Sequence, residues 1–163
     1  MTVQISIIGL GQIGASVGLA LAGQKDRIIR IGNDKDLSIV QKAHKIGAID
    51  EAVTNLHKAV ENSDLILLTL PVDQLQETIT IIAQTLKQGA VVMETSPVKG
   101  IVAEWMAELL PESCHYVGLT PVLNPAYLHS FDTGIDGAHA DLFRGGLMAI
   151  ASPPTTDSAA IKL

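Results

Sequence analysis

The sequence predicts an α/β fold in which helices cover both faces of a doubly wound, mostly parallel sheet. Short apolar runs alternate along the chain with helical segments. Hydrophobic residues make up 47% of the 163 residues but aromatic residues only 3%, as is typical of aliphatic strands buried on both faces. Glycines spaced G-x-G-x-x-G directly follow the first apolar run. Right-handed crossovers then predict one sheet of about six or seven strands, within a domain over residues 1–152.

The glycine turn consists of Gly9, Gly11 and Gly14, between a first strand that includes 5–8 and a helix over 15–22. Gly9 allows a tight turn, Gly11 lets the backbone approach a pyrophosphate, and Gly14 lets the helix pack on the strand. The helix N-terminus offers free N–H groups and a positive dipole end to phosphates. We therefore predict a dinucleotide site that also includes Gln12 and Ile13.

A second strand over 27–33 ends at Asp34, 20 residues after Gly14. A carboxylate there can accept hydrogen bonds from ribose hydroxyls and would repel a 2′-phosphate. The sequence thus predicts NAD as cofactor, and NADP stays possible because Lys35 is adjacent. The alternative is that Asp34 caps or turns the chain before the next helix.

The remaining elements continue the alternation. After a helix over 36–45, its exit over 46–50 and a helical turn over 56–61, an apolar run over 65–70 ends at Pro71 and predicts a central strand. Further along we expect a helix over 72–86, a strand over 89–94, a helix over 99–110, a strand over 115–119, an irregular stretch over 124–144 with a short helix, a strand over 147–151, and a helix start within 153–163.

Ligands of such sheets bind where the strands end. Leu70, Pro71 and Val72 are expected along the path from adenine to nicotinamide, and Thr95 beside the nicotinamide. Lys99 could bind a substrate carboxylate or pair with a phosphate, Ser96 could hydrogen-bond the substrate or the nicotinamide amide, and Thr120 could orient a polar substrate group. Each has a structural alternative: Lys99 as a solvated lysine that opens a helix, and the others as turn or loop residues.

Composition narrows the partners and the compartment. The net charge is −6 without a basic run, so nucleic acid and anionic membranes are not expected as partners. No apolar stretch is long enough to span a bilayer, and the first strand begins too early for a signal peptide. A single cysteine, Cys114, is consistent with the cytoplasm. No metal-ligand spacing occurs, so we expect no metal.

Several motifs stand together in a familiar order: the glycine turn, Gly32-Asn-Asp34, the run from Asp64 to Val72, Val98-Lys99, and Asp141-Leu-Phe143. Over nearly its whole length the chain resembles the nucleotide-binding domain of prephenate and arogenate dehydrogenases. The resemblance implies oxidative decarboxylation of prephenate or arogenate toward tyrosine with NAD or NADP. It also implies a small carboxylate substrate and a second, helical domain beyond residue 163 that forms a homodimer.

The chain departs from this family at two positions. Where the family usually reads Asp-x-x-Ser-Val-Lys, this chain has Pro97 in place of the serine, and where the family reads Gly-x-His-Pro, it has Thr120 in place of the histidine. Because threonine is no general base near neutral pH, His129 becomes the candidate base. A non-catalytic nucleotide-binding or redox-sensing module, and a reductase of an imine or ketoacid, stay open as alternatives.

Overall fold

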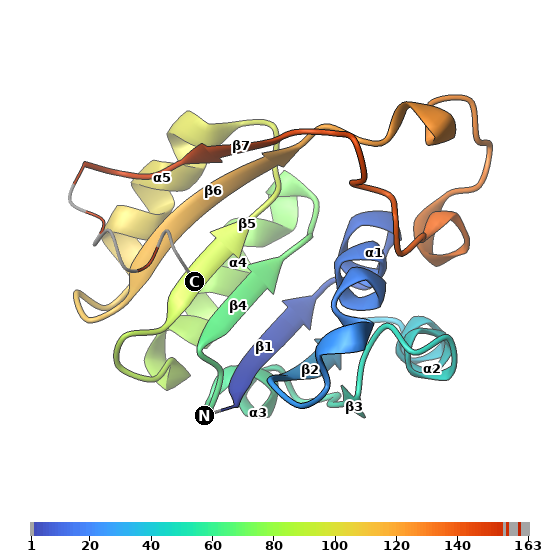
Figure 1. The fold of residues 1–163 in the computed structure, drawn as a ribbon. Helices are drawn as coiled ribbons and strands as arrows, with labels where there is room; N and C mark the ends of the chain where they lie inside the picture. Colours follow the sequence, from blue (N-terminus) through green and yellow to red (C-terminus); the bar gives the residue numbers. More distant parts are fainter. Residues whose placement is uncertain (1, 155, 157–159, 161–163) are drawn as a thin grey trace.

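In the computed structural model, which describes residues 2–154, 156 and 160, the strands form one sheet in the order β3-β2-β1-β4-β5-β6-β7 (Figure 1). Every neighbouring pair is parallel except β6 and β7, which are antiparallel. The predicted doubly wound, mostly parallel sheet is therefore confirmed. The strands are β1 (Val3–Ile8), β2 (Ile28–Asn33), β3 (Glu51–Ala52), β4 (Leu65–Leu68), β5 (Val91–Glu94), β6 (His115–Pro121) and β7 (Met148–Ala151).

Helices cover the two faces of the sheet (Figure 1). Consecutive residues of β1 face opposite sides of the sheet. Ile7 packs in the cluster with α1 and α2, whereas Ile8 packs in the cluster with α3, α4 and α5. In the described part of the chain, no helix has the length and apolarity needed to cross a membrane. The helices are α1 (Gln12–Ala20), α2 (Leu37–Lys45), α3 (Leu56–Val60), α4 (Val72–Ile82) and α5 (Lys99–Leu109), with short 3₁₀ turns η1 (Ala22–Gln24), η2 (Ala83–Thr85), η3 (Pro125–Tyr127) and η4 (Gly134–Gly137).

Local chemistry sets the limits of α2. The Asp36 side chain accepts a hydrogen bond from the backbone N–H of Ser38 at 2.8 Å, which caps the helix N-terminus. Hydrogen bonds from Ser38 hold the pKa of Asp36 below its usual range. The chain leaves the helix at Gly47, whose φ of 77° suits glycine. Asp36, rather than Asp34, is therefore the capping residue.

The structure differs from the sequence-based expectations mainly at element ends. β3 occupies part of a stretch that carried no strand prediction, because both its residues are exposed and show no apolar pattern. α1 begins at Gln12 rather than at 15, since the residues of the glycine turn already form its first turn. α4 ends at Ile82 and continues as a 3₁₀ turn rather than as a helix to 86. The helix start predicted within 153–163 falls largely outside the described residues.

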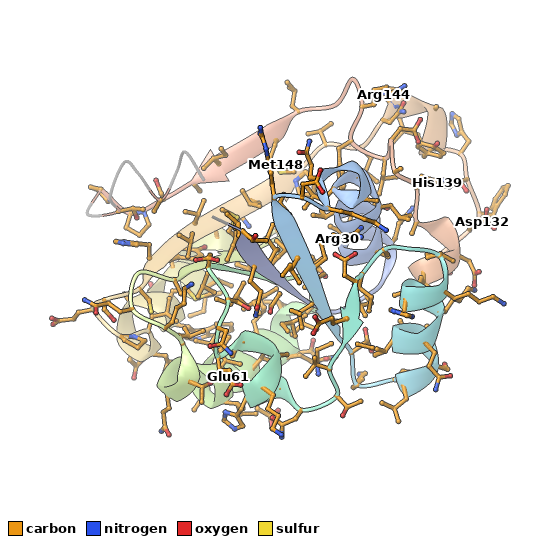
Figure 2. All side chains as sticks on the ribbon, turned by 60° about the horizontal axis from the view of Figure 1, so that its bottom comes forward. Arg30, Glu61, Asp132, His139, Arg144 and Met148 are labelled. Carbon is orange, nitrogen blue, oxygen red and sulfur yellow. The ribbon has the colours of Figure 1, made fainter. Side chains whose placement is uncertain are left out.

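The connection between β6 and β7 crosses the molecule to reach α1 and α2 (Figures 1 and 2). Its Ile135 is 4% exposed and packs in the α1–α2 cluster. The backbone N–H of His139 donates to Ser16 Oγ on α1 at 2.9 Å, and Asp136 forms an ion pair with Lys42 of α2. The stretch predicted as a loop with a short helix is thus irregular but firmly attached, through η3 and η4.

A buried arginine on β2 joins three segments (Figure 2). Arg30 is 1% exposed, and its Nη1 donates to the carbonyl oxygens of Gly18 at 2.7 Å and Gly47 at 2.9 Å. Its Nη2 and Nε donate to the two carboxylate oxygens of Asp50 at 2.6 and 2.9 Å. Because the guanidinium is paired and hydrogen-bonded on several sides, its burial is compensated.

This ion pair predicts a pH-dependent contribution to stability. Hydrogen bonds from Arg30 hold the pKa of Asp50 below its usual range, so its contribution is complete above about pH 4 and is lost as pH falls through the lowered pKa. Asp50→Asn should cost about 2–3 kcal/mol at pH 7, because the guanidinium loses a charged hydrogen-bond partner, and the difference from the wild type should shrink at pH 3. Urea unfolding at both pH values measures this. Asp26→Asn, at an exposed carboxylate, should leave the free energy of unfolding unchanged at both pH values. Equal losses of stability in the two variants would contradict the role of Asp50.

Candidate functional site

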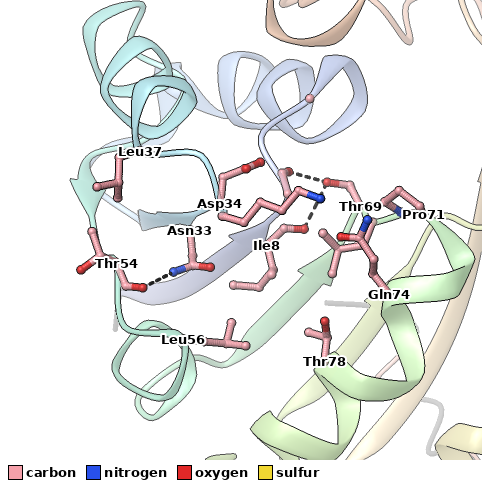
Figure 3. Close-up of a pocket in the computed structure, with 14 residues that line it drawn as sticks. Ile8, Asn33, Asp34, Leu37, Thr54, Leu56, Thr69, Pro71, Gln74 and Thr78 are labelled. Carbon is pink, nitrogen blue, oxygen red and sulfur yellow. Dashed lines mark hydrogen bonds between the residues drawn. The ribbon is translucent and has the colours of Figure 1, made fainter.

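A cleft of about 410 Å³ lies where β1, β2 and β4 end (Figure 3). Five of the residues predicted to bind a dinucleotide line this cleft: Gly9, Gly11, Asp34, Leu70 and Pro71. The other lining residues come from the ends of β1, β2 and β4, from the start of α2, from α4, and from the segment that leads into α3: Ile8, Asn33, Lys35, Leu37, Thr54, Leu56, Thr69, Gln74 and Thr78.

The three glycines of the turn meet different constraints. Gly9 has a φ of 92°, and a Cβ on Gly14 would lie 2.1 Å from the carbonyl oxygen of Gly9. Both positions are therefore required by the fold itself. A Cβ on Gly11, in contrast, would have no atom within 4 Å. The open space beside Gly11 is the room that a phosphate group needs for close approach to the backbone.

The N-terminus of α1 faces the same space without a protein cap. Gly11 is the N-cap residue and supplies no side-chain hydrogen bond, and the first turn carries no acidic residue. Gln12 and Ile13, which begin the helix, are both partly exposed. Since the first N–H groups of a helix have no partner within it, this end of α1 suits an anion.

Asp34 stands at the end of β2 and connects it to the glycine turn. Its Oδ2 accepts a hydrogen bond from the backbone N–H of Leu10 at 2.8 Å, and its Oδ1 accepts one from the N–H of Asp36 at 3.0 Å. A carboxylate has about four acceptor sites, so these bonds leave capacity for ribose hydroxyls. Asp34 thus turns the chain and lines the cleft at the same time.

A second polar cluster lies at the ends of β5 and β6. Glu94 is 0% exposed, and its Oε1 accepts hydrogen bonds from Lys99 Nζ at 2.7 Å and from the Tyr116 hydroxyl at 2.9 Å. Lys99 Nζ also donates to the carbonyl oxygen of Leu119 at 2.6 Å. Burial, together with the charge of Glu94, raises the pKa of Tyr116. The ammonium group of Lys99 is therefore engaged by the protein itself.

The candidate substrate-side residues do not gather in the cleft. Ser96 lies in the cluster around Glu94, where its backbone N–H donates to Glu94 Oε2 at 2.6 Å. Thr120 is exposed on β6 and pairs with Ala149 of β7. His129 is exposed on the connection after η3. Neither these side chains nor Val72 and Thr95 belong to the cleft lining.

Two further polar residues line the cleft, although neither was predicted to bind the dinucleotide. Thr69 Oγ1 donates to the carbonyl oxygen of Gly9 at 2.5 Å, and Asn33 Nδ2 donates to the carbonyl oxygen of Val53 at 2.7 Å. Their only sequence signal is position, because each is a polar residue at the end of an apolar run. The described residues contain no cluster of three side chains suited to a metal ion.

A parallel sheet with a glycine turn, an uncapped helix and a carboxylate after the second strand defines a nucleotide-binding α/β domain of the Rossmann type. The family model described as "Prephenate dehydrogenase, nucleotide-binding domain" matches residues 17–163. The chain belongs to this family. Because the match begins after Gly14, the glycine turn is an independent observation.

The chain is also similar to characterised proteins. It is 27% identical over 157 residues to cyclohexadienyl dehydrogenase of Zymomonas mobilis, covering 96% of this chain and 52% of that protein. With prephenate dehydrogenase of Lactococcus lactis the identity is 28% over 142 residues, 86% of this chain and 38% of that protein. The chain therefore spans about half or less of the length of these relatives.

Solved structures share the fold. Prephenate dehydrogenase of Aquifex aeolicus, in complex with hydroxyphenyl propionate and NAD+, superposes with a TM-score of 0.85 at 23% identity, over 99% of this chain and 55% of that one. Synechocystis arogenate dehydrogenase superposes with a TM-score of 0.82 at 26% identity, over 98% of this chain and 53% of that one.

The glycine geometry predicts that Gly14→Ala and Gly11→Ala differ in stability. The new methyl group at position 14 would strike backbone, at a cost of about 3 kcal/mol. At position 11 it enters open space, and only the poorer N-cap preference of alanine counts, less than about 1 kcal/mol. Urea unfolding of the two variants measures the difference. Equal destabilisation would show that the space beside Gly11 is not open in solution.

Proposed function

We propose that this chain is the NAD-binding domain of a dehydrogenase that acts on prephenate, arogenate or a related small carboxylate. The observation that carries the proposal is the open space at Gly11 beside the uncapped α1, next to the carboxylate of Asp34. Pyrophosphate would bind the turn formed by Gly9, Gly11, Gln12, Ile13 and Gly14, and the adenosine ribose would bind Asp34.

The rest of the cofactor would follow the ends of β4 and β5. Leu70, Pro71 and Val72 would lie along its path, and Thr95 beside the nicotinamide. NAD, when bound, supplies the hydride acceptor, and this chain's own residues would bind and orient it. Ser96, Lys99, Thr120 and His129 are the candidates on the substrate side, of which Ser96 and Lys99 lie nearest to the β5 end.

The proposal extends to the longer protein. Prephenate and cyclohexadienyl dehydrogenases are about twice as long as this chain or longer, so we propose that residues 153–163 lead into a second domain. That domain would complete the substrate site and form the homodimer. The absence of a basic run and the single cysteine support a cytoplasmic enzyme without nucleic-acid or membrane partners.

Cofactor titration tests the proposed site directly. NADH should bind at least tenfold more tightly than NADPH, a difference of about 1.4 kcal/mol, because the charge of Asp34 repels a 2′-phosphate. Asp34→Asn keeps the size of the side chain and should reduce the ratio to less than about threefold. Gly11→Ala should weaken both ligands. Nicotinamide fluorescence measures all of these affinities.

Other outcomes of the titration contradict parts of the proposal. If neither dinucleotide binds at millimolar concentration, the cleft is no dinucleotide site. If NADPH binds as well as NADH and Asp34→Asn changes nothing, the carboxylate plays no part in selecting the cofactor.

A non-catalytic nucleotide-binding module is the second candidate, and one observation favours it. The family histidine position is held by Thr120, an exposed threonine, and Lys99 is engaged by Glu94 and Leu119. Among the substrate-side candidates, only the exposed His129 carries an imidazole, the side chain most often used as a general base.

Restoring a base at position 120 separates the two functions. In the complete protein that carries this domain, Thr120→His should raise the turnover of prephenate or arogenate with NAD+ by about tenfold or more, since a positioned base contributes that much. Thr120→Asn is the matched control and should not. If both the wild type and Thr120→His bind NADH yet convert neither substrate, the non-catalytic function is favoured.

A further inference from the structure

Four apolar side chains of β5, β6 and β7 form what we call the open face: Met93, Leu119, Met148 and Ile150. The strand pairing places them on one side of the sheet, because Met93 lies beside Val117, and Leu119 lies opposite Ile150. Ile150 is 53% exposed and Met148 40%, and the other two are partly exposed. The described residues therefore leave an uncharged apolar patch in contact with water, which is unfavourable.

The two faces of these strands are covered differently. On the far face, Val92 and Tyr116 pack in the large apolar cluster with α4 and α5, which lie behind the sheet in Figure 1. The register places Met93 in one row with Leu67 and Ile7, so the open face continues the side of the sheet that α1 and α2 cover at β1. Because parallel strands are normally buried on both faces, a cover is expected here too.

One residue beyond β7 packs against this part of the sheet. Ala160 is 3% exposed and forms a small cluster with Val91 and Val117, against which Met93 and Leu119 of the open face pack. Val91 is the first residue of β5. The chain beyond β7 therefore returns to the sheet and reaches the open face on the side where β5 begins.

We propose that the open face is the docking surface for a helix of the segment that follows residue 163 in the complete protein. The inference rests on the proposed longer protein and names the surface that its second domain contacts. The chain spans only 52% and 38% of its relatives' lengths. An occupant in the same chain acts at a high effective concentration, whereas a separate copy needs an interface of about 1,200 Å², more than four partly exposed side chains offer.

The dimensions of the open face fit one helix. Neighbouring strands lie about 4.8 Å apart, so β5, β6 and β7 together span about 10 Å, the diameter of a helix with its side chains. From Val117 to Pro121 the strand rises about 13 Å, which about nine helical residues cover. A helix that begins near Ala160 and runs parallel to β6 would thus reach Thr120, and it would bring the second domain to the substrate side of the site.

Thiol labelling of the complete protein tests the inference. In a Cys114→Ser background, Ile150→Cys should react with a maleimide at least about tenfold more slowly than Ile81→Cys on α4, because a helix covers position 150. Ile81 is the matched control: it is also an isoleucine and is 38% exposed, less than Ile150 at 53%. Slower labelling at position 150 therefore cannot come from the residues of this domain. Each rate is divided by that of the same variant unfolded in urea.

The other outcomes overturn the inference. If Ile150→Cys reacts as fast as Ile81→Cys, the open face is exposed in the complete protein. If the protection disappears on about a hundredfold dilution, a second copy covers the face and the occupant is wrong. Should Ile150→Cys not fold, Met148→Cys replaces it, because Met148 is 40% exposed on the same face.

NADH titration of the same variants separates this inference from the proposed cofactor site. Neither Ile150 nor Ile81 lines the cleft, so both variants should bind NADH as tightly as the wild type. Slow labelling at position 150 in a protein that binds no dinucleotide would refute the cofactor site and leave the docking surface standing. Fast labelling in a protein that binds NADH would do the reverse.

Discussion

The close crossing of the glycine turn over the end of β4 is the constraint on which the rest of the site depends. A side chain at Gly14 would overlap the carbonyl oxygen of Gly9, and Thr69 Oγ1 donates to that same oxygen. This contact brings the start of α1 close to the carboxyl ends of the central strands β1 and β4. The helix N-terminus, the cleft and the carboxylate of Asp34 come together only because the turn is this tight.

Two ion pairs, each with one fully buried member, connect segments that are distant in the sequence. Arg30, paired with Asp50, joins β2 to the last turn of α1 and to the exit of α2. Glu94, paired with Lys99, joins the ends of β5 and β6. In both cases several hydrogen bonds satisfy the buried charge, so the pairs act as fixed connections between segments rather than as a general source of stability.

The two halves of the proposed site differ in completeness. The cleft proposed for the cofactor is already formed, with open space beside Gly11 and the carboxylate of Asp34 at the end of β2. The substrate half offers Ser96 and an exposed Thr120, in a chain that spans about half or less of its relatives. This division suits a family in which a common nucleotide-binding domain is combined with other structure to define the reaction.

The sequence by itself determined the doubly wound, mostly parallel fold, the order of its main elements and the common position of Gly9, Gly11 and Asp34. Apolar runs and glycine spacing are local signals, and the fold places Gly9, Gly11 and Asp34 together as that spacing predicts. Only the tertiary structure decided the partners of Lys99, since Glu94 and Leu119 come from separate strands. It also decided the exposed β3 and the attachment of the β6–β7 connection to α1. Such contacts depend on which distant segments meet, and no local pattern in the chain records that.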